Sequence, residues 1–272
     1  MIINRTLNRF AAAAALAAAL GAASVSGAFA QGAAGSHPGP SGTVVKAGRQ
    51  LDDDGWHGDG LWLDAAENKK VDDFLVRAQR AEQSISPEMR AVAQISHATL
   101  IGFDQRLKSP DSLKRKVATS LQAEPGQTVD AALARISDSI RYTLEWPDGR
   151  YTKGVAAASS MLASWGNDST KWSNTWGRKN GYKGINSAWR DLRSGHVFEV
   201  QFHTPSSKWA QEVTHKLYEE QRLPSTPPTR ARELQEQQDA IFTSVPVPEG
   251  AEGLAAPAAR RPVGAQTLPA AG

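Results

Sequence analysis

A strictly alternating segment, residues 198–204, constrains the fold of this chain more than any other. Neighbouring side chains of an extended strand point to opposite faces. The apolar members are Phe198, Val200 and Phe202. The polar members, a carboxylate, an amide and an imidazole, are Glu199, Gln201 and His203. A strand that buries its apolar face in a core therefore presents these polar groups together in one cleft.

A basic, glycine-containing segment, residues 178–186, precedes this strand. Asn180-Gly181 is a strong turn signal, and Tyr182 follows it with Arg178 and Lys179 close by. An aromatic ring beside cations is able to stack a nucleobase while the cations hold phosphates. A solvated hairpin turn is the alternative for this segment taken alone, because charged turns are common.

A second basic segment lies upstream and indicates a phosphate site. Residues 99–103 form a short apolar run, predicted as a strand that delivers Arg106 and Lys108 to its end. Ser109-Pro110 then predicts the start of a helix over residues 112–121. Cations beside a helix N-terminus are a common arrangement for gripping phosphates.

The remaining pattern predicts an α+β fold, with a mixed sheet of about five strands flanked by helices. Strands are expected over 99–103, 136–145, 182–189 and 196–203, the last two as a hairpin, and residues 165–176 are expected as strand and loop. Asp138 and Arg141 fall on the second of these strands. Helices are expected over 64–83, 86–97, 112–121, 129–135, 151–164, 206–222 and 230–242. Trp209, Val213 and Leu217 are expected on the inner face of helix 206–222.

The N-terminus reads as a signal peptide over residues 1–30, with Arg5 and Arg9 before an apolar run and Ala28-Phe29-Ala30 before the cleavage point. A membrane anchor is the alternative, but the apolar run is short and rich in alanine. Residues 31–60 are expected as a disordered lead-in, 61–223 as the folded domain, and 224–272 as a helix with a disordered tail beyond Val245. We expect no membrane contact after cleavage, and a secreted or periplasmic protein.

Composition narrows the chemistry. The chain has no cysteine, which rules out disulfides, cysteine zinc sites and cysteine nucleophiles. The formal net charge of +3 suits a small anionic substrate and is too weak to indicate nucleic-acid binding.

Taken in order, the motifs resemble the synthetase domain of RelA/SpoT-type alarmone synthetases over roughly residues 95–222. They are R-x-K-x-x-x-S at 106–112 with a later Lys116, an Asp-bearing strand at Asp138, K-N-G-Y-x-x-I at 179–185, and E-V-Q-x-x-T at 199–204. The resemblance implies a nucleotidyltransferase-like fold. It also implies an enzyme that transfers the β,γ-diphosphate of ATP to the 3′-hydroxyl of a second nucleotide and releases AMP.

The resemblance also implies residue roles. The donor ATP would be held by Arg106, Lys108, Ser112, Lys116 and Arg141. The acceptor would be held by Arg178, Lys179, Tyr182, Asn186, Gln201 and His203, with Tyr182 stacking its base. Asp138 and Glu199 would bind Mg²⁺, and Glu199 acts as base, as metal ligand or as both.

The chain departs from the family pattern on the acceptor side. Asn186 stands where the family commonly has histidine, and His203 where it has arginine. Arg141 also follows Asp138 more closely than the family arginine does. The His-Asp metal signature of the family's hydrolase domain is not in the sequence, so we expect synthesis only.

Exported relatives of this fold act on adenine nucleotides, so the signal peptide favours ATP and other purine nucleotides as acceptors. A secreted toxin of the same chemistry, a non-catalytic nucleotide-binding relative and a scaffold with chance motifs are the alternatives. The oligomeric state stays open.

Overall fold

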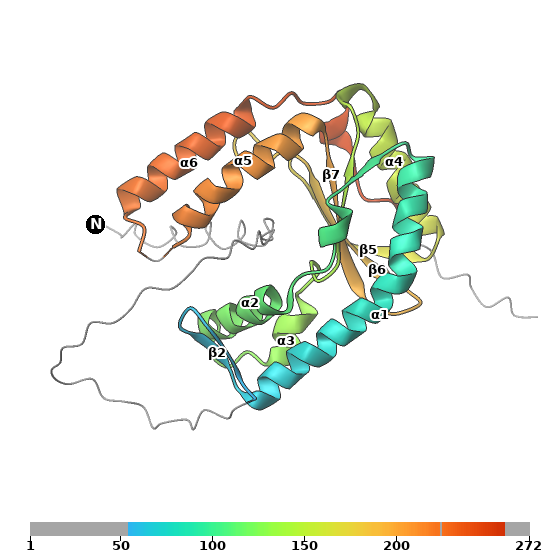
Figure 1. Cartoon of the computed structure of the whole chain (residues 1–272). Coiled ribbons are helices and arrows are strands. Elements are labelled where there is room, and N and C mark those ends of the chain that lie inside the picture. The colour runs from blue at the N-terminus through green and yellow to red at the C-terminus, as the bar shows by residue number, and fades with distance from the viewer. Residues whose placement is uncertain (1–53, 224, 259–272) are drawn as a thin grey trace, which may run out of the picture. The chain divides into compact units, whose positions relative to one another are not determined.

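The computed structural model describes residues 54–223 and 225–258 (Figure 1). The predicted signal peptide and most of the predicted lead-in lie outside these residues. The described chain forms two compact units. The larger comprises Val76–Lys108 and the described residues from Ile136 onward; the smaller comprises the described residues up to Leu75 and Ser109–Arg135. No helix in the described part of the chain is both long and apolar enough to cross a membrane.

The larger unit contains a five-stranded mixed sheet of order β3-β4-β7-β6-β5. The strands are β3 (Thr99–Ile101), β4 (Arg141–Glu145), β5 (Asn167–Asn174), β6 (Ile185–Asp191) and β7 (Val197–His203). Strands β4 and β7 are parallel, and the other neighbours are antiparallel. The predicted α+β class is confirmed, and so is the predicted hairpin, which β6 and β7 form.

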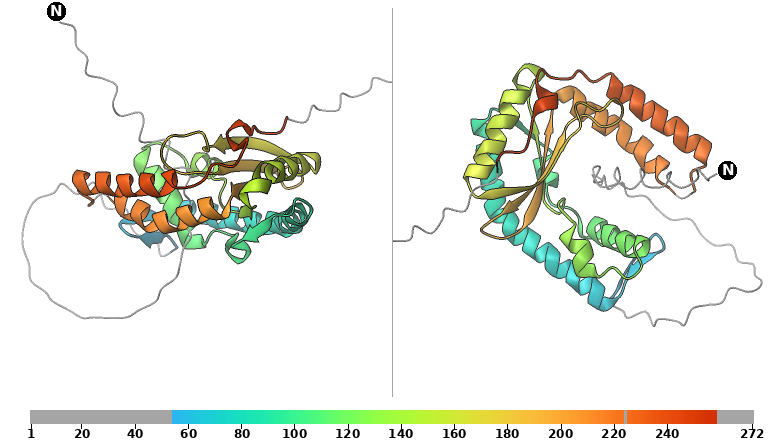
Figure 2. Two further views of the ribbon diagram at one scale, coloured as in Figure 1. Left: turned by 90° about the horizontal axis from the view of Figure 1, so that it is seen from above. Right: turned by 180° about the vertical axis from the view of Figure 1, so that it is seen from behind.

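Helices cover both sides of this sheet. They are α1 (Ala65–Ile95), α4 (Asp148–Ser164), α5 (Pro205–Gln221) and α6 (Pro228–Thr243), with short 3-10 turns η1 (Phe103–Gln105) and η2 (Ala251–Gly253). The C-terminal half of α1 and α4 lie on one side of the sheet, and α5 and α6 lie on the other (Figures 1 and 2).

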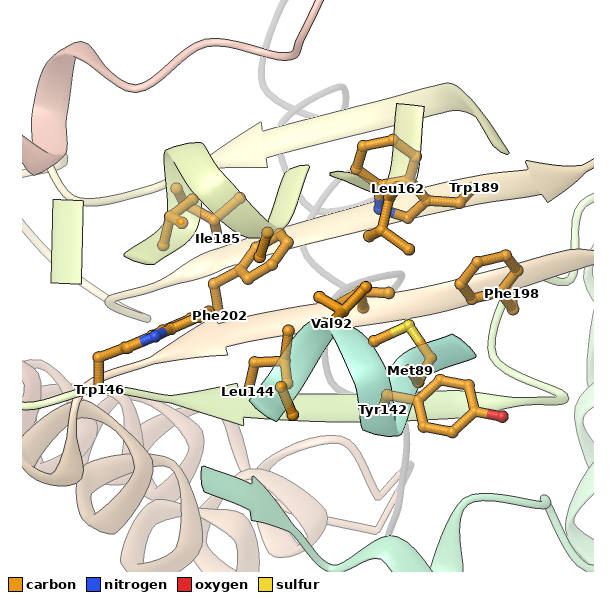
Figure 3. Close-up of a cluster of buried hydrophobic side chains, with 14 of the residues drawn as sticks. Met89, Val92, Tyr142, Leu144, Trp146, Leu162, Ile185, Trp189, Phe198 and Phe202 are labelled. Carbon is orange, nitrogen blue, oxygen red and sulfur yellow. The ribbon is translucent and has the colours of Figure 1, made fainter. Parts of the chain in front are cut away.

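The apolar face of the alternating strand forms the core, as predicted. Phe198, Val200 and Phe202 are fully buried. Figure 3 shows the side chains of Met89 and Val92 from α1 beside those of β4 and β7. The core lies between the sheet and the α1 and α4 layer, so the polar side chains of β7 point toward the α5 side.

Helix α1 is continuous, whereas two helices were predicted around Ser86-Pro87. A proline inside a helix removes one hydrogen bond to the carbonyl four residues earlier. That carbonyl belongs to Gln83, and both Gln83 and Pro87 are exposed, so water is able to satisfy it. The buried stripe of Ala81, Ile85 and Met89 continues past the proline, which explains why packing overrides the local signal.

Helix α5 lies where it was predicted, but its inner face differs. Trp209 and Val213 are 54% and 40% exposed, whereas Ser207, Ala210 and Thr214 are buried. The helix therefore meets the sheet with small and polar side chains, because polar groups of β7 face it.

The tail beyond Val245 was predicted to be disordered, yet the structure describes it up to residue 258, and it packs against the larger unit. Ala251 is fully buried. The Asn174 side-chain amide donates to the carbonyls of Ala251, Glu252 and Leu254 at 2.8, 3.2 and 3.0 Å. These long-range partners explain why composition alone misjudged the segment.

The smaller unit consists of β1 (Trp56–Gly58), β2 (Leu61–Leu63), α2 (Pro110–Ala123), α3 (Val129–Ala134) and the start of α1. Its hairpin begins inside the predicted lead-in, because Asp59-Gly60 forms a two-residue turn with positive φ at both positions, a strong hairpin signal. The predicted cap of α2 is confirmed: the Ser109 hydroxyl accepts from the Ser112 amide.

Two glycines of α4 provide a matched test of packing. A Cβ at Gly154 would overlap the buried indole of Trp146, whereas a Cβ at Gly149 would meet nothing within 4 Å. We expect Gly154→Ala to lower the free energy of unfolding by about 1–3 kcal/mol through overpacking. Gly149→Ala should leave it unchanged or raise it by up to about 1 kcal/mol. Urea unfolding measures both, and equal effects would contradict the packing of Gly154 on Trp146.

Candidate active site

The polar faces of β4 and β7 form the base of the candidate site. The two strands are parallel, and their register places Arg141 beside Glu199, Thr143 beside Gln201, and Glu145 beside His203. Strand β6 continues the rows, with Asn186 beside Gln201. Period-two alternation therefore brings a predicted donor residue, a predicted base and three predicted acceptor residues onto one surface.

Arg141 joins the two predicted metal ligands. Its Nε donates to Glu199 Oε1 at 2.7 Å, and its Nη2 donates to Asp138 Oδ2 at 3.0 Å. Lys108 Nζ also lies 3.2 Å from Asp138 Oδ2. The side chains of both acids are more than nine-tenths buried. The carboxylates thus lie on the same side of the sheet and share one guanidinium.

Asp138 was predicted on a strand, but it lies on the turn before β4, which begins at Arg141. Backbone hydrogen bonds hold this turn on both sides. Lys108 N donates to Ser139 O at 3.0 Å, and Glu199 N donates to Ile140 O at 2.9 Å. The turn lets the Asp138 and Arg141 side chains meet, which a continuous strand would not allow because residues three apart face opposite ways.

Charge holds this cluster together. Burial disfavours the charged guanidinium of Arg141, but the neighbouring carboxylates of Glu199 and Asp138 outweigh it and raise the pKa of Arg141. The cluster contains two carboxylates, one guanidinium and one ammonium, so its formal charge balances. Buried charges persist only when paired in this way.

Arg106, a predicted donor residue, is held by groups that the sequence did not point to. Its Nε donates to Glu82 Oε1 at 2.6 Å and to Ser86 Oγ at 3.0 Å, and its guanidinium lies 4.4 Å from the centre of the Phe103 ring. Burial opposes ionisation of Glu82, but hydrogen bonds from Ser86 and Arg106 outweigh it and lower its pKa. Glu82 is 24 residues away in the chain, and no local pattern links it to Arg106.

On the acceptor side, a buried hydrogen-bond network occupies the polar groups. The Tyr182 hydroxyl donates to Asn186 Oδ1 at 2.9 Å and lies 2.8 Å from His203 Nε2. His203 Nδ1 lies 2.9 Å from Ser207 Oγ.

This network sets the state of His203. Burial, aided by the charge of Lys208, lowers the pKa of His203 to about 3. The residue is therefore neutral at physiological pH and does not replace the charge of the family's arginine. Tyr182 is also packed, with its ring edge-on to His203 and to Phe242 of α6; its stacking on a base stays a prediction.

The basic loop between β5 and β6 contains cations in different settings. Arg178 and Lys179 are exposed, in keeping with a role toward solvent-borne phosphates. Lys183 is buried, and its ammonium donates to the carbonyls of Trp176 and Arg178, so it closes the loop. Ser112 and Lys116 lie on α2 in the smaller unit, and their role toward a donor nucleotide stays a prediction.

Asp138 and Glu199 suit magnesium in the type of their ligand atoms, since Mg²⁺ prefers carboxylate oxygens and usually takes only one or two from the protein. Within residues 54–223 and 225–258, no group of three or more His, Cys, Asp or Glu side chains is placed to hold a metal ion. The pair therefore fits Mg²⁺ when phosphate and water oxygens complete the shell.

Comparison with known proteins finds similar folds only. No protein-family model and no curated protein matches the sequence. Small alarmone synthetase 1 from Bacillus subtilis is similar at 13% identity and TM-score 0.45, over 63% of this chain and 90% of that one. A GTP pyrophosphokinase family protein from Streptococcus pneumoniae is similar at 14% identity and TM-score 0.46, over 63% of this chain and 87% of that one.

Small alarmone synthetase 2 from Bacillus subtilis is similar at 14% identity and TM-score 0.44, over 62% of this chain and 90% of that one. Two of these three neighbours are named as small alarmone synthetases and one as a GTP pyrophosphokinase family protein. No residue role and no substrate follows from these values for this chain.

Arg141 should be necessary for stability. Removing its charge leaves two buried carboxylates without their shared partner, so we expect Arg141→Met to lower the free energy of unfolding by about 3–5 kcal/mol. Arg190→Met, at an exposed position of β6, is the control and should change it by less than about 0.5 kcal/mol. Urea unfolding that shifted equally in both variants would refute the bridging role.

Stability should also fall with acidity between pH 6.5 and 5. The pKa of His203 is lowered to about 3 and that of His196 to about 4, so the unfolded chain binds protons first as the pH falls through 6.5. Each histidine then removes up to about 1.4 kcal/mol per pH unit. Urea unfolding across this window should show that the free energy of unfolding changes less steeply with pH in His203→Gln than in the wild type. Identical pH slopes in the two proteins would contradict the buried, neutral state of His203.

Proposed function

We propose that this protein is a nucleotide 3′-pyrophosphokinase, which transfers the β,γ-diphosphate of ATP to the 3′-hydroxyl of a purine nucleotide and releases AMP. The observation that carries the proposal is the cluster on the polar sheet face, where Asp138 and Glu199 share Arg141 and Lys108 stands beside them. The motif order along the chain supports the same reading.

The chemistry needs alignment and charge neutralisation more than covalent help. The acceptor's 3′-oxygen attacks the β-phosphorus, the bond from that phosphorus to the oxygen bridging it to the α-phosphate breaks, and AMP leaves with this oxygen. The hydroxyl proton needs a base. Glu199 is our candidate, because Arg141 and Gln201 hydrogen-bond its Oε1 at 2.7 and 2.8 Å and so fix its orientation.

Asp138 and Glu199 would hold Mg²⁺, which when bound supplies positive charge to the transferring phosphates. Arg106 and Lys108 would bind the donor triphosphate. Arg106 is preorganised for this, since Glu82, Ser86 and Phe103 restrict its side chain, and less entropy is then lost on binding.

We place the protein outside the cytoplasm because residues 1–30 read as a signal peptide. ATP, ADP, AMP or GTP are the proposed acceptors, and products of the pppApp type follow from adenine acceptors. An alternative biological role is that of a toxin, which would carry out the same reaction inside other cells. Expression in a host cytoplasm without residues 2–30 tests this role, because a toxin would stop growth of the host.

The activity test uses the purified protein with ATP, Mg²⁺ and each purine nucleotide in turn, with products separated by anion-exchange chromatography. We expect AMP and a 3′-pyrophosphorylated nucleotide in equal amounts. Glu199→Gln and Asp138→Asn should lower the rate by about 10²–10⁴-fold, with thermal unfolding as the check on folding. Glu236→Gln, an exposed carboxylate on α6, is the charge-matched control.

A protein that binds ATP and yields no AMP with any purine acceptor would be a nucleotide-binding relative without turnover. A rate that is equally reduced in the Glu236 control would show that Glu199 and Asp138 have no special part in the reaction.

A further inference from the structure

The acceptor side of the sheet is short of positive charge. His203 is neutral and fully buried, with both ring nitrogens engaged by Tyr182 and Ser207. Asn186 is neutral and accepts from Tyr182. Lys108 and Arg141 face carboxylates. The predicted acceptor cations Arg178 and Lys179 lie on the exposed loop between β5 and β6, so a nucleotide that lies along β7 beyond Glu199 would draw further positive charge from another element.

Helix α5 brings such a cation to the polar face. The Gln201 amide donates to Glu199 Oε1 at 2.8 Å, and the Gln211 amide donates to Gln201 Oε1 at 3.4 Å. Lys208 Nζ in turn donates to Gln211 Oε1 at 2.9 Å. A chain of side-chain hydrogen bonds thus runs from the candidate base to the ammonium group of Lys208.

The surroundings of Lys208 differ from those of a solvated surface lysine. Its side chain is only 19% exposed, so most of its stem is packed. The positive charge of Lys208 acts on two groups of the sheet. It helps to lower the pKa of His203, and it opposes the rise that burial imposes on the pKa of Glu145. Its carboxylate partner, Glu212 at 3.4 Å, is 61% exposed, and exposed ion pairs are weak.

We propose that Lys208 binds the β- and γ-phosphates at the 5′ end of the acceptor nucleotide, which rests on the function proposed above. A nucleotide whose 3′-hydroxyl lies at Glu199 carries its 5′-phosphates on the far side of the ribose. Lys208 stands apart from Glu199 along the same polar face, and its ammonium is able to exchange an exposed carboxylate for a phosphate. The acceptors are then nucleoside 5′-diphosphates and triphosphates in preference to monophosphates.

The proposal also explains the departure at the family's arginine position. His203 lies at the junction between β7 and α5. Its imidazole hydrogen-bonds to Ser207, and Ser207 forms the N-terminal capping box of α5 with Thr204. Burial and the charge of Lys208 lower the pKa of His203, so this position disfavours a positive charge. Lys208, one turn into α5, supplies the positive charge from outside this junction.

The test compares Lys208→Met with Lys216→Met, which removes the same charge from an exposed position of the same helix. GMP, GDP and GTP serve as acceptors at saturating ATP, and only the guanine product is measured. We expect Lys208→Met to raise KM for GDP and GTP by about tenfold or more, as for a lost hydrogen bond to a charged group. KM for GMP and for the ATP donor should change little, and Lys208→Arg should restore the wild-type values.

Binding of GDP and GTP, measured by calorimetry in the same variants, separates this proposal from the proposed function. If the wild type makes no AMP but Lys208→Met alone loses GDP binding, the activity proposal fails and the Lys208 site stands. If the enzyme turns over and both methionine variants keep the same KM for GDP, the Lys208 site fails alone. A wild type that binds neither GDP nor GTP overturns the Lys208 site, whatever its activity.

Discussion

The guanidinium of Arg141 holds together the part of the structure that the proposed chemistry needs. Asp138 and Glu199 come from segments about sixty residues apart in the chain, and both are buried. Without a shared cation, two buried carboxylates would repel each other and lose their hydration. The parallel pairing of β4 with β7 places Arg141 beside Glu199, and the preceding turn brings Asp138 to the same guanidinium.

Strand β7 serves the core and the site at once. Its apolar residues pack against α1 and α4, while its polar residues hold the hydrogen bonds that link Arg141, Gln201 and His203 to their neighbours. A shift of one residue in register would expose the core and bury the polar groups without partners. The same constraint that stabilises the sheet therefore also positions Glu199.

Helix α5 completes the polar face because its inner surface is small and polar. Ser207 hydrogen-bonds to His203, and Gln211 hydrogen-bonds to Gln201. Hydrogen bonds therefore join this helix to the sheet, in place of the apolar contacts that an apolar helix would make. This leaves Trp209 and Val213 exposed and allows Lys208 to lie over the sheet. A prediction based only on the apolar stripe of this helix therefore places the wrong face toward the site.

The sequence alone determined the features that depend on neighbouring residues: the two faces of β7, the hairpin of β6 and β7, the cap of α2 and the α+β class. Alternation and capping are local, so they survive in any fold. It did not determine that α1 continues through Pro87 or that Asn174 holds the tail. Nor did it reveal that Glu82 holds Arg106 and that Lys208 reaches the polar face. Tertiary structure decided these because each depends on atoms from segments distant in the chain, and hydrogen bonding and packing between such segments outweigh the local preference of either one.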